Sequence, residues 1–146
     1  MKADAKTEKE VMIVWLKFLE AYSARDMDSL LATMSSDSSV VSMGTGSDER
    51  RVGLKEIKTQ IIRDWAQSEA ATVEMTWNQV SAAGTVAWIA SEGIFKAKIG
   101  GKKVDFPCRL SAVLQKQKDQ WLLMQTHLSF IEAGQTEGES FPAGKE

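Results

Sequence analysis

The chain contains a single cysteine, Cys108, and a single histidine, His127. One cysteine cannot form a disulfide within the chain or supply a cysteine-rich zinc site. One histidine without clustered carboxylates is too few for the usual zinc or iron sites. We therefore expect a protein that binds no metal and uses no cofactor.

The sequence also lacks a block of basic residues, because Arg50–Arg51 and Lys102–Lys103 are isolated pairs. With a net charge of -2 and a pI near 5.5, it is not typical of a nucleic-acid-binding protein. The first residues, MKADAKTEKE, have no apolar core of a signal peptide. No apolar run is long enough to span a bilayer, so we expect a cytoplasmic protein without a membrane partner.

Apolar residues are plentiful and change their spacing along the chain. The chain has 146 residues and is 43% hydrophobic, which suits one domain with a substantial core. A capping box at Thr7 and Glu10 predicts a helix over residues 8–24, and Asp26 is the N-cap of a short second helix. Apolar residues at helical spacing predict a third helix that begins near Gly53.

After Ser68 the apolar period becomes two, which indicates strands. Gly100 and Gly101 separate two strand-like runs and predict a two-residue hairpin turn, whose central positions both need φ > 0. The connections are too short for parallel crossovers, so the strands form an antiparallel meander. The expected strands are Val40–Met43, Thr72–Ser81, Thr85–Ile99, Lys102–Lys116 and Gln120–Ile131.

Three helices followed by a curved meander predict an α+β fold, with the helices on one face of a mostly antiparallel sheet. In such a cone the helices leave a cavity at the open end. We expect one domain over residues 1–131, followed by a polar tail over residues 132–146.

The Gly-Gly turn fixes a strand register in which Glu92 lies directly opposite Arg109. We expect both side chains to face the cavity with Trp88, since Ile94 and Val113 on the same face are apolar. Charged side chains rarely point into a core unless they are paired or functional, so this pair marks a candidate site.

His127 is the only ordinary base near neutral pH and lies on the neighbouring strand. A register error of one residue decides which face it occupies, and the sequence leaves this open. Facing the cavity, His127 would act as general base, oriented by Glu92, while Arg109 holds an anionic ligand group. Alternatively, the three residues form a buried structural ion pair with a hydrogen-bonded histidine.

Tryptophans are numerous for this length, and an aromatic pocket for a flat organic ligand is one interpretation. Each of them alone is equally compatible with an ordinary core position. The expected ligand-binding residues are Trp15, Trp65, Trp88 and Ser129. The charged loop Asp48–Arg51 either supplies an acid or base at the cavity mouth or is a solvated charge run.

Several segments resemble SnoaL-like, ketosteroid-isomerase-like proteins of the NTF2-like superfamily, over residues 8–131. They are AYSARDMDSLLATMSSDSSVV, GTGSDERRVGLKEI, WIASEG and DQWLLMQTHLSF. The resemblance implies a cone fold with a ligand-sized cavity. This group includes isomerases, cyclases, dehydratases, ligand binders and dimerisation modules, so the fold does not choose among them.

The resemblance does not extend to the ketosteroid isomerase mechanism, which needs a carboxylate base and an oxyanion hole of a tyrosine and a protonated aspartate. Phe18 stands at the tyrosine position, and the base position falls near Ser42. No acidic residue occurs between Phe106 and Lys118, where the second aspartate would lie.

Two functions remain. The first is a small-molecule-binding protein that performs proton transfer or hydration on a small carbonyl-containing ligand. The second is a homodimeric association module with a vestigial cavity, because an uncovered apolar sheet face usually finds a partner. The residues expected on that outer face are Ile89, Phe95, Leu110, Leu122 and Met124.

Overall fold

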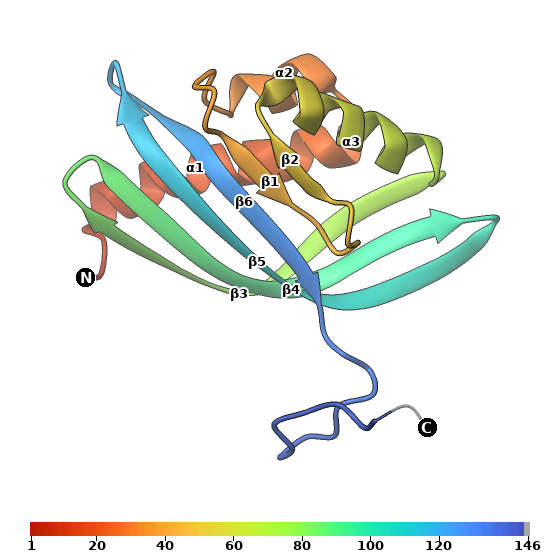
Figure 1. Ribbon diagram of the computed structural model, residues 1–146. Coiled ribbons are helices and arrows are strands. Elements are labelled where there is room, and N and C mark those ends of the chain that lie inside the picture. Colours follow the sequence, from red (N-terminus) through yellow and green to blue (C-terminus); the bar gives the residue numbers. More distant parts are fainter. Residues whose placement is uncertain (145–146) are drawn as a thin grey trace.

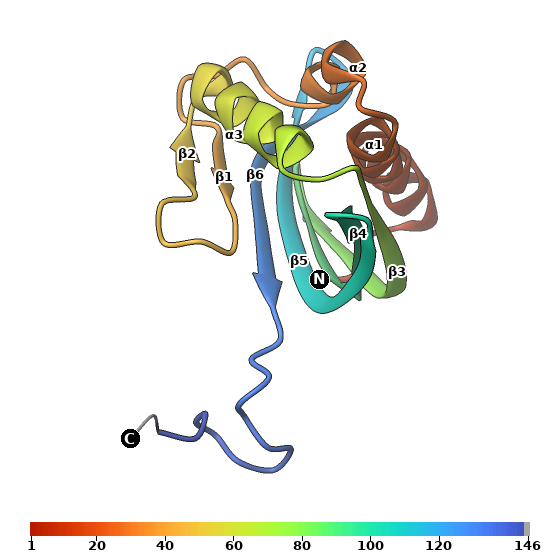
Figure 2. The same cartoon turned by 90° about the vertical axis from the view of Figure 1, so that its right-hand side faces the viewer.

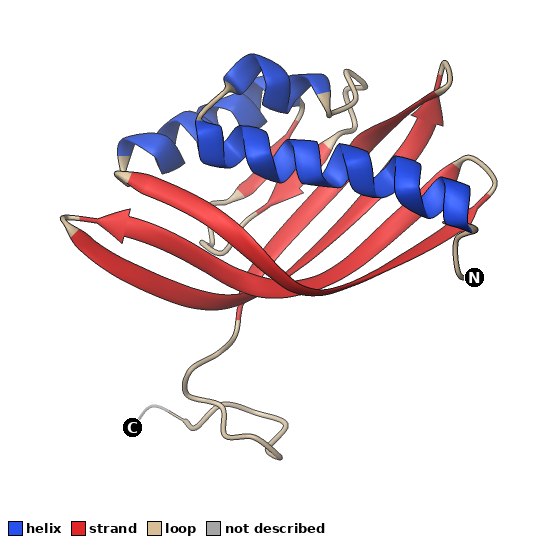
Figure 3. Ribbon diagram, turned by 180° about the vertical axis from the view of Figure 1, so that it is seen from behind, coloured by secondary structure: helices blue, strands red, loops and turns tan. Residues whose placement is uncertain are grey.

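The computed structural model describes residues 1–144. Within them, three helices cover one face of a six-stranded sheet (Figures 1 and 3). The helices are α1 (Ala5–Ala24), α2 (Met27–Ala32) and α3 (Leu54–Ala66). The strands are β1 (Val41–Met43), β2 (Arg50–Val52), β3 (Ala70–Ala83), β4 (Val86–Ile99), β5 (Lys102–Gln117) and β6 (Gln120–Phe130).

The strands lie in the order β2-β1-β6-β5-β4-β3. β1 runs parallel to β6, and every other neighbouring pair is antiparallel. The predicted α+β class and mostly antiparallel sheet are therefore confirmed. β2 was expected to be part of a polar loop, because its three residues are too few to show an alternating pattern.

Local capping fixes the helix boundaries, and α1 begins earlier than predicted. Asp4 is the N-cap, and its carboxylate accepts a hydrogen bond from the Thr7 N–H at 2.8 Å. α1 ends at Arg25, whose φ of 58° lies in the left-handed region. Asp26 caps α2 through the Ser29 N–H, as the sequence predicted. None of these helices in the described part of the chain combines the length and apolarity needed to cross a membrane.

The predicted hairpin register is also confirmed. Gly100 and Gly101 have φ of 58° and 77°, and Ile99 pairs with Lys102. Counting down the ladder, Glu92 pairs with Arg109. Two positive φ values at the turn explain why glycine occupies both positions.

A bulge bends the sheet between Met75 and Trp77 of β3, where the β3–β4 register shifts. Gly93 of β4 lies opposite Met75, and a Cβ atom added there would be 2.6 Å from the Glu74 carbonyl oxygen. A side chain at residue 93 would therefore separate the two strands. The bent sheet has a concave face under the helices and a convex outer face (Figure 3).

The core fills the space between the helices and the concave face. α1 contributes Val11 and Trp15, and the strands contribute Ile89, Leu114 and Leu123, all with at most 1% of their surface exposed. The tail beyond β6 contains neither helix nor strand in its described residues and extends away from the sheet (Figure 2). Lys145 and Glu146 of the expected tail lie outside the described residues.

Candidate functional site

A cavity of about 270 Å³ lies between the concave sheet face and helices α1 and α3. Its walls are mainly apolar and aromatic, which favours a small organic ligand over an ion. The wall residues include Trp15, Phe18, Leu19, Val73, Phe95 and Leu110.

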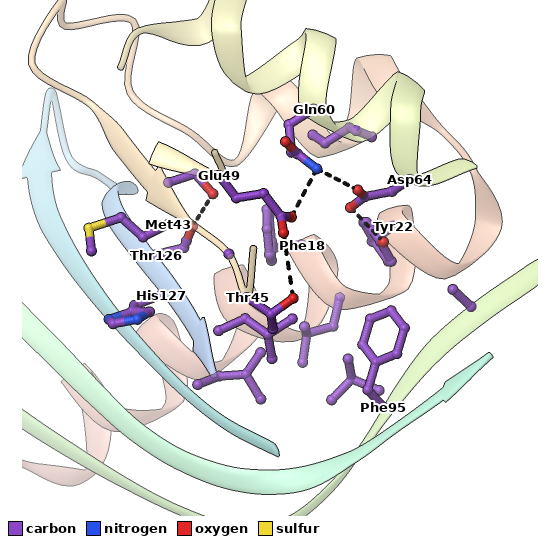
Figure 4. Close-up of a pocket in the computed structure, with 18 of the residues that line it drawn as sticks. Phe18, Tyr22, Met43, Thr45, Glu49, Gln60, Asp64, Phe95, Thr126 and His127 are labelled. Carbon is purple, nitrogen blue, oxygen red and sulfur yellow. Dashed lines mark hydrogen bonds between the residues drawn. The ribbon is translucent and has the colours of Figure 1, made fainter. Parts of the chain in front are cut away.

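A polar cluster forms one side of this cavity (Figure 4). The Tyr22 hydroxyl of α1 donates to Asp64 Oδ2 of α3 at 2.9 Å. Gln60, one turn before Asp64, donates from Nε2 to Asp64 Oδ1 at 2.7 Å and to Glu49 Oε1 at 3.0 Å. One amide group therefore bridges two carboxylates that would otherwise repel each other.

Glu49 reaches the cluster from the loop between β1 and β2. Its Oε2 atom accepts hydrogen bonds from the Gly46 N–H and, at 3.5 Å, from the Thr45 hydroxyl. A Cβ atom at Gly44 would lie 2.6 Å from Glu49 Oε1, so this glycine leaves room for the carboxylate. The loop folds around Glu49 and directs it toward Gln60.

Two arginines balance the cluster from outside the cavity. Arg51 Nε donates to Gln60 Oε1 at 3.0 Å, which fixes the amide orientation with its two N–H groups toward the carboxylates. Arg63 pairs with Asp48 at 2.6 Å and lies 4.0 Å from Glu49. The negative charge of the carboxylates is thus partly compensated, although neither arginine lies between them and the cavity.

Burial is the main cause of the pKa shifts of Asp64 and Tyr22. Burial raises the pKa of Asp64 above its usual range, and the negative charge of Glu49 adds to the rise, while hydrogen bonds from Gln60 and Tyr22 oppose it. Burial also raises the pKa of the Tyr22 phenol, and Asp64 raises it further. Tyr22 is therefore a neutral donor, and Asp64 has the stronger basicity of a partly buried carboxylate.

The structure corrects the expected position of Glu92 and Arg109. They are cross-strand neighbours at 3.7 Å, as predicted, but both lie on the convex face with their side chains 49% and 64% exposed. The buried positions of β4 are Ala87, Ile89, Ser91, Gly93 and Ala97, so the opposite alternation faces the helices. The turn fixes which residues pair, but it does not decide which face the helices cover.

His127 is also exposed, and it pairs with the exposed Ser111. In Figure 4, His127 lies beside Met43 and apart from the polar cluster. The β5–β6 register shifts between Val113 and Leu114, which places His127 and the buried Leu123 on opposite faces. His127 borders the cavity, but Glu92 and Arg109 do not, so the expected three-residue cluster inside the cavity is wrong.

The four expected ligand-binding residues lie in different places. Trp15 lines the cavity and is fully buried, with its Nε1 3.2 Å from Met75 Sδ. Trp65 does not line the cavity but donates to the Tyr22 carbonyl at 3.1 Å. Trp88 and Ser129 are exposed on the convex face, since Trp88 alternates with the buried Ala87 and Ile89 and Ser129 pairs with Arg109.

Sequence reasoning missed the polar cluster, apart from naming Glu49 within a charged loop. Tyr22 has helical spacing from Trp15 and Phe18, and Gln60 and Asp64 have the spacing of neighbours on one helix face. These signals existed, but the sequence separation of 42 between Tyr22 and Asp64 concealed their contact. Within residues 1–144, no three histidine, cysteine or acidic side chains converge as a metal site requires.

Comparison with protein families identifies a SnoaL-like domain over residues 11–133. The chain belongs to the SnoaL-like domain family. Comparison with curated proteins gave no match. The resemblance seen in the sequence is thereby confirmed for most of the chain.

Solved structures share the fold of this SnoaL-like domain. An NTF2-like superfamily protein from Salmonella enterica has a TM-score of 0.81 and 15% identity, covering 93% of this chain and 99% of that one. A provisionally assigned dehydratase of the NTF2-like family from Streptomyces avermitilis has a TM-score of 0.80 and 18% identity, covering 89% of this chain and 100% of that one. At these identities the likeness establishes the NTF2-like cone fold alone.

Proposed function

We propose that this SnoaL-like domain binds a small, largely apolar organic molecule in its cavity and that Asp64 exchanges a proton with it. One observation carries the proposal: a carboxylate with a raised pKa adjoins an apolar cavity of about 270 Å³. Tyr22 and Gln60 hold that carboxylate in a fixed orientation. Glu92, Arg109 and His127 have no part in this proposal, because Glu92 and Arg109 lie on the convex face and His127, at the edge of the cavity, is exposed and apart from the polar cluster.

The reaction class that this arrangement supports is general acid–base catalysis. A carbonyl-containing ligand, as expected from the sequence, has an acidic C–H group beside its carbonyl, and Asp64 would accept that proton. The Streptomyces avermitilis structure, provisionally assigned as a dehydratase, is compatible with proton-transfer chemistry on this fold. Since only ionised Asp64 accepts a proton, the rate should rise as the pH increases through its raised pKa.

Asp64→Asn should abolish proton exchange on a bound carbonyl probe. With phenylacetone in D₂O, the protein should accelerate loss of the proton NMR signal from the carbon beside the carbonyl. The variant should be about 10²- to 10⁴-fold slower, the usual contribution of a general base. Asp28→Asn, which changes an exposed carboxylate of α2 outside the cavity wall, is the matched control. Equal rates for the protein, both variants and buffer would contradict the proposal.

A second proposal is a homodimer through the convex face, the alternative that the sequence suggested. Of the residues expected there, Ile89, Phe95 and Leu110 face the helices instead. The convex face nevertheless exposes 48% of Trp77 and 37% of Trp88 on neighbouring strands. Large exposed aromatic side chains are typical of association surfaces.

Light scattering should therefore give a dimer mass at micromolar concentration. Trp88→Glu should shift the mass toward the monomer, because it places a charge among the apolar groups to be buried. Lys103→Glu, on the same sheet but exposed near the hairpin tip, should leave the mass unchanged. A monomer mass for the unmodified protein would reject the dimer without affecting the cavity proposal.

A further inference from the structure

The hydrogen atoms of the polar cluster are already engaged within the protein. The Tyr22 hydroxyl donates to Asp64, and both N–H groups of the Gln60 amide donate to carboxylates. The Thr45 hydroxyl donates to Glu49 Oε2 at 3.5 Å. The cluster therefore offers a ligand no remaining donor from these three side chains.

Acceptor capacity, in contrast, remains. An ionised carboxylate has about four acceptor positions. Asp64 accepts two hydrogen bonds within the described residues, from Tyr22 and Gln60. The Tyr22 oxygen also keeps its lone pairs while it donates. A ligand group that meets this cluster is therefore matched if it brings a hydrogen atom, and mismatched if it brings only lone pairs.

The charges of the cavity wall act in the same direction. Within residues 1–144, the wall includes Glu49 and Asp64 but no lysine or arginine. Arg51 and Arg63 approach the cluster from outside and are held by Gln60 and Asp48. His127, at the wall's edge, is exposed and lies apart from the cluster. An anionic group placed at the cluster would therefore face two carboxylates without a cation of its own.

We propose that the cavity selects ligands whose polar end is a hydroxyl or an amine, and that it discriminates against ethers, carbonyl oxygens, carboxylates and phosphates at that end. This inference rests on the proposed function, since it requires that the cavity binds a small molecule. A carbonyl-containing ligand satisfies it by presenting a hydrogen-bearing group to Asp64 while its carbonyl oxygen points elsewhere.

Four probes with the same ring separate the possibilities: benzyl alcohol, benzylamine, benzyl methyl ether and benzoate. Affinities measured by ligand-detected NMR at pH 8 should favour the alcohol and the amine over the ether by at least about tenfold, because the ether leaves the acceptors unpaired. Benzoate should bind most weakly. An ether or benzoate that binds as tightly as the alcohol would overturn the donor selectivity.

Asp64→Asn provides the sharper test, because an asparagine amide supplies hydrogen atoms where the carboxylate supplies none. The preference for alcohol over ether should fall toward unity, and benzylamine should lose the most affinity. Tyr22→Phe, a second variant, should keep the preference because the Asp64 acceptors remain. An unchanged preference in a folded Asp64→Asn protein would overturn the inference.

Substitutions at two alanines of β4 distinguish a failure of the donor selectivity from a failure of the cavity to bind ligands. Ala97→Leu adds volume to the cavity wall, whereas Ala90→Leu adds the same volume on the exposed face of the same strand. Alcohol binding should weaken in the Ala97 variant alone. If all four probes bind equally and only Ala97→Leu weakens them, the cavity binds ligands but the donor selectivity is wrong. If no probe binds, or Ala97→Leu has no effect, both proposals fail.

Discussion

Replacing Arg25 with alanine should lower the free energy of unfolding by about 2–4 kcal/mol, because hydrogen bonds to a charged group are worth more than neutral ones. The Arg25 guanidinium donates to the Trp65 carbonyl at 2.6 Å, the Ser68 carbonyl at 2.8 Å and the Ser68 hydroxyl at 3.1 Å. Trp65 donates back to the Tyr22 carbonyl. These bonds join the C-terminal ends of α1 and α3, which carry Tyr22 and Asp64.

Substitutions at the same position separate the guanidinium from the backbone effect. Arg25 has φ of 58°, so Arg25→Gly loses the hydrogen bonds but relieves the left-handed conformation. The glycine variant should be more stable than the alanine variant by about 1 kcal/mol. Arg25→Lys keeps the charge without the planar fork and should fall between alanine and the native protein.

Urea denaturation measures these differences, with Arg50→Ala as the control on an exposed strand residue. That control should change stability by less than about 0.5 kcal/mol. Were Arg25→Ala to cost no more than Arg50→Ala, the guanidinium would not hold the two helices together. Loosening α3 should also weaken ligand binding in the cavity, since Gln60 and Asp64 belong to this helix.

Gly93→Ala should cost about 1–3 kcal/mol, the usual penalty for inserting a methyl group where no space exists. The added Cβ would lie 2.6 Å from the Glu74 carbonyl oxygen and 3.3 Å from the Met75 Cα. Both obstacles are backbone atoms of β3, so no side-chain rotation can relieve the contact. The strands would have to separate at the bulge that bends the sheet.

Thermal unfolding of Gly93→Ala compares directly with Gly144→Ala. Gly144 has no atom within 4 Å of an added Cβ and does not have a positive φ, so its replacement should leave the midpoint unchanged. Because the bend shapes the concave face, we also expect the Gly93 variant to bind benzyl alcohol more weakly. A Gly93→Ala protein as stable as the control would show that the two strands separate without loss.

The sequence by itself determined the elements and much of their pairing. The cap at Asp26, the helical spacing of apolar residues and the Gly100–Gly101 turn are local signals that act within a few residues. For this reason the α+β cone and the Glu92–Arg109 register could be predicted. Such signals depend on residues that are close in the sequence, so tertiary contacts change them little.

Only the tertiary structure decided which face became the interior. β4 alternates two sets of residues that both include apolar side chains, and Trp88 was expected inside and Ile89 outside, whereas the structure has the reverse. The helices selected the set with Ala87 and Ile89, and a bulge in the β5–β6 pair placed His127 on the exposed face.

The candidate site depended on the tertiary structure even more strongly. Tyr22, Glu49, Gln60 and Asp64 come from two helices and a loop, and they meet only because α1 and α3 pack over the same end of the sheet. The raised pKa values of Tyr22 and Asp64 arise chiefly from burial in that packing. Burial is a property of the assembled layers, so no spacing in the sequence could reveal it.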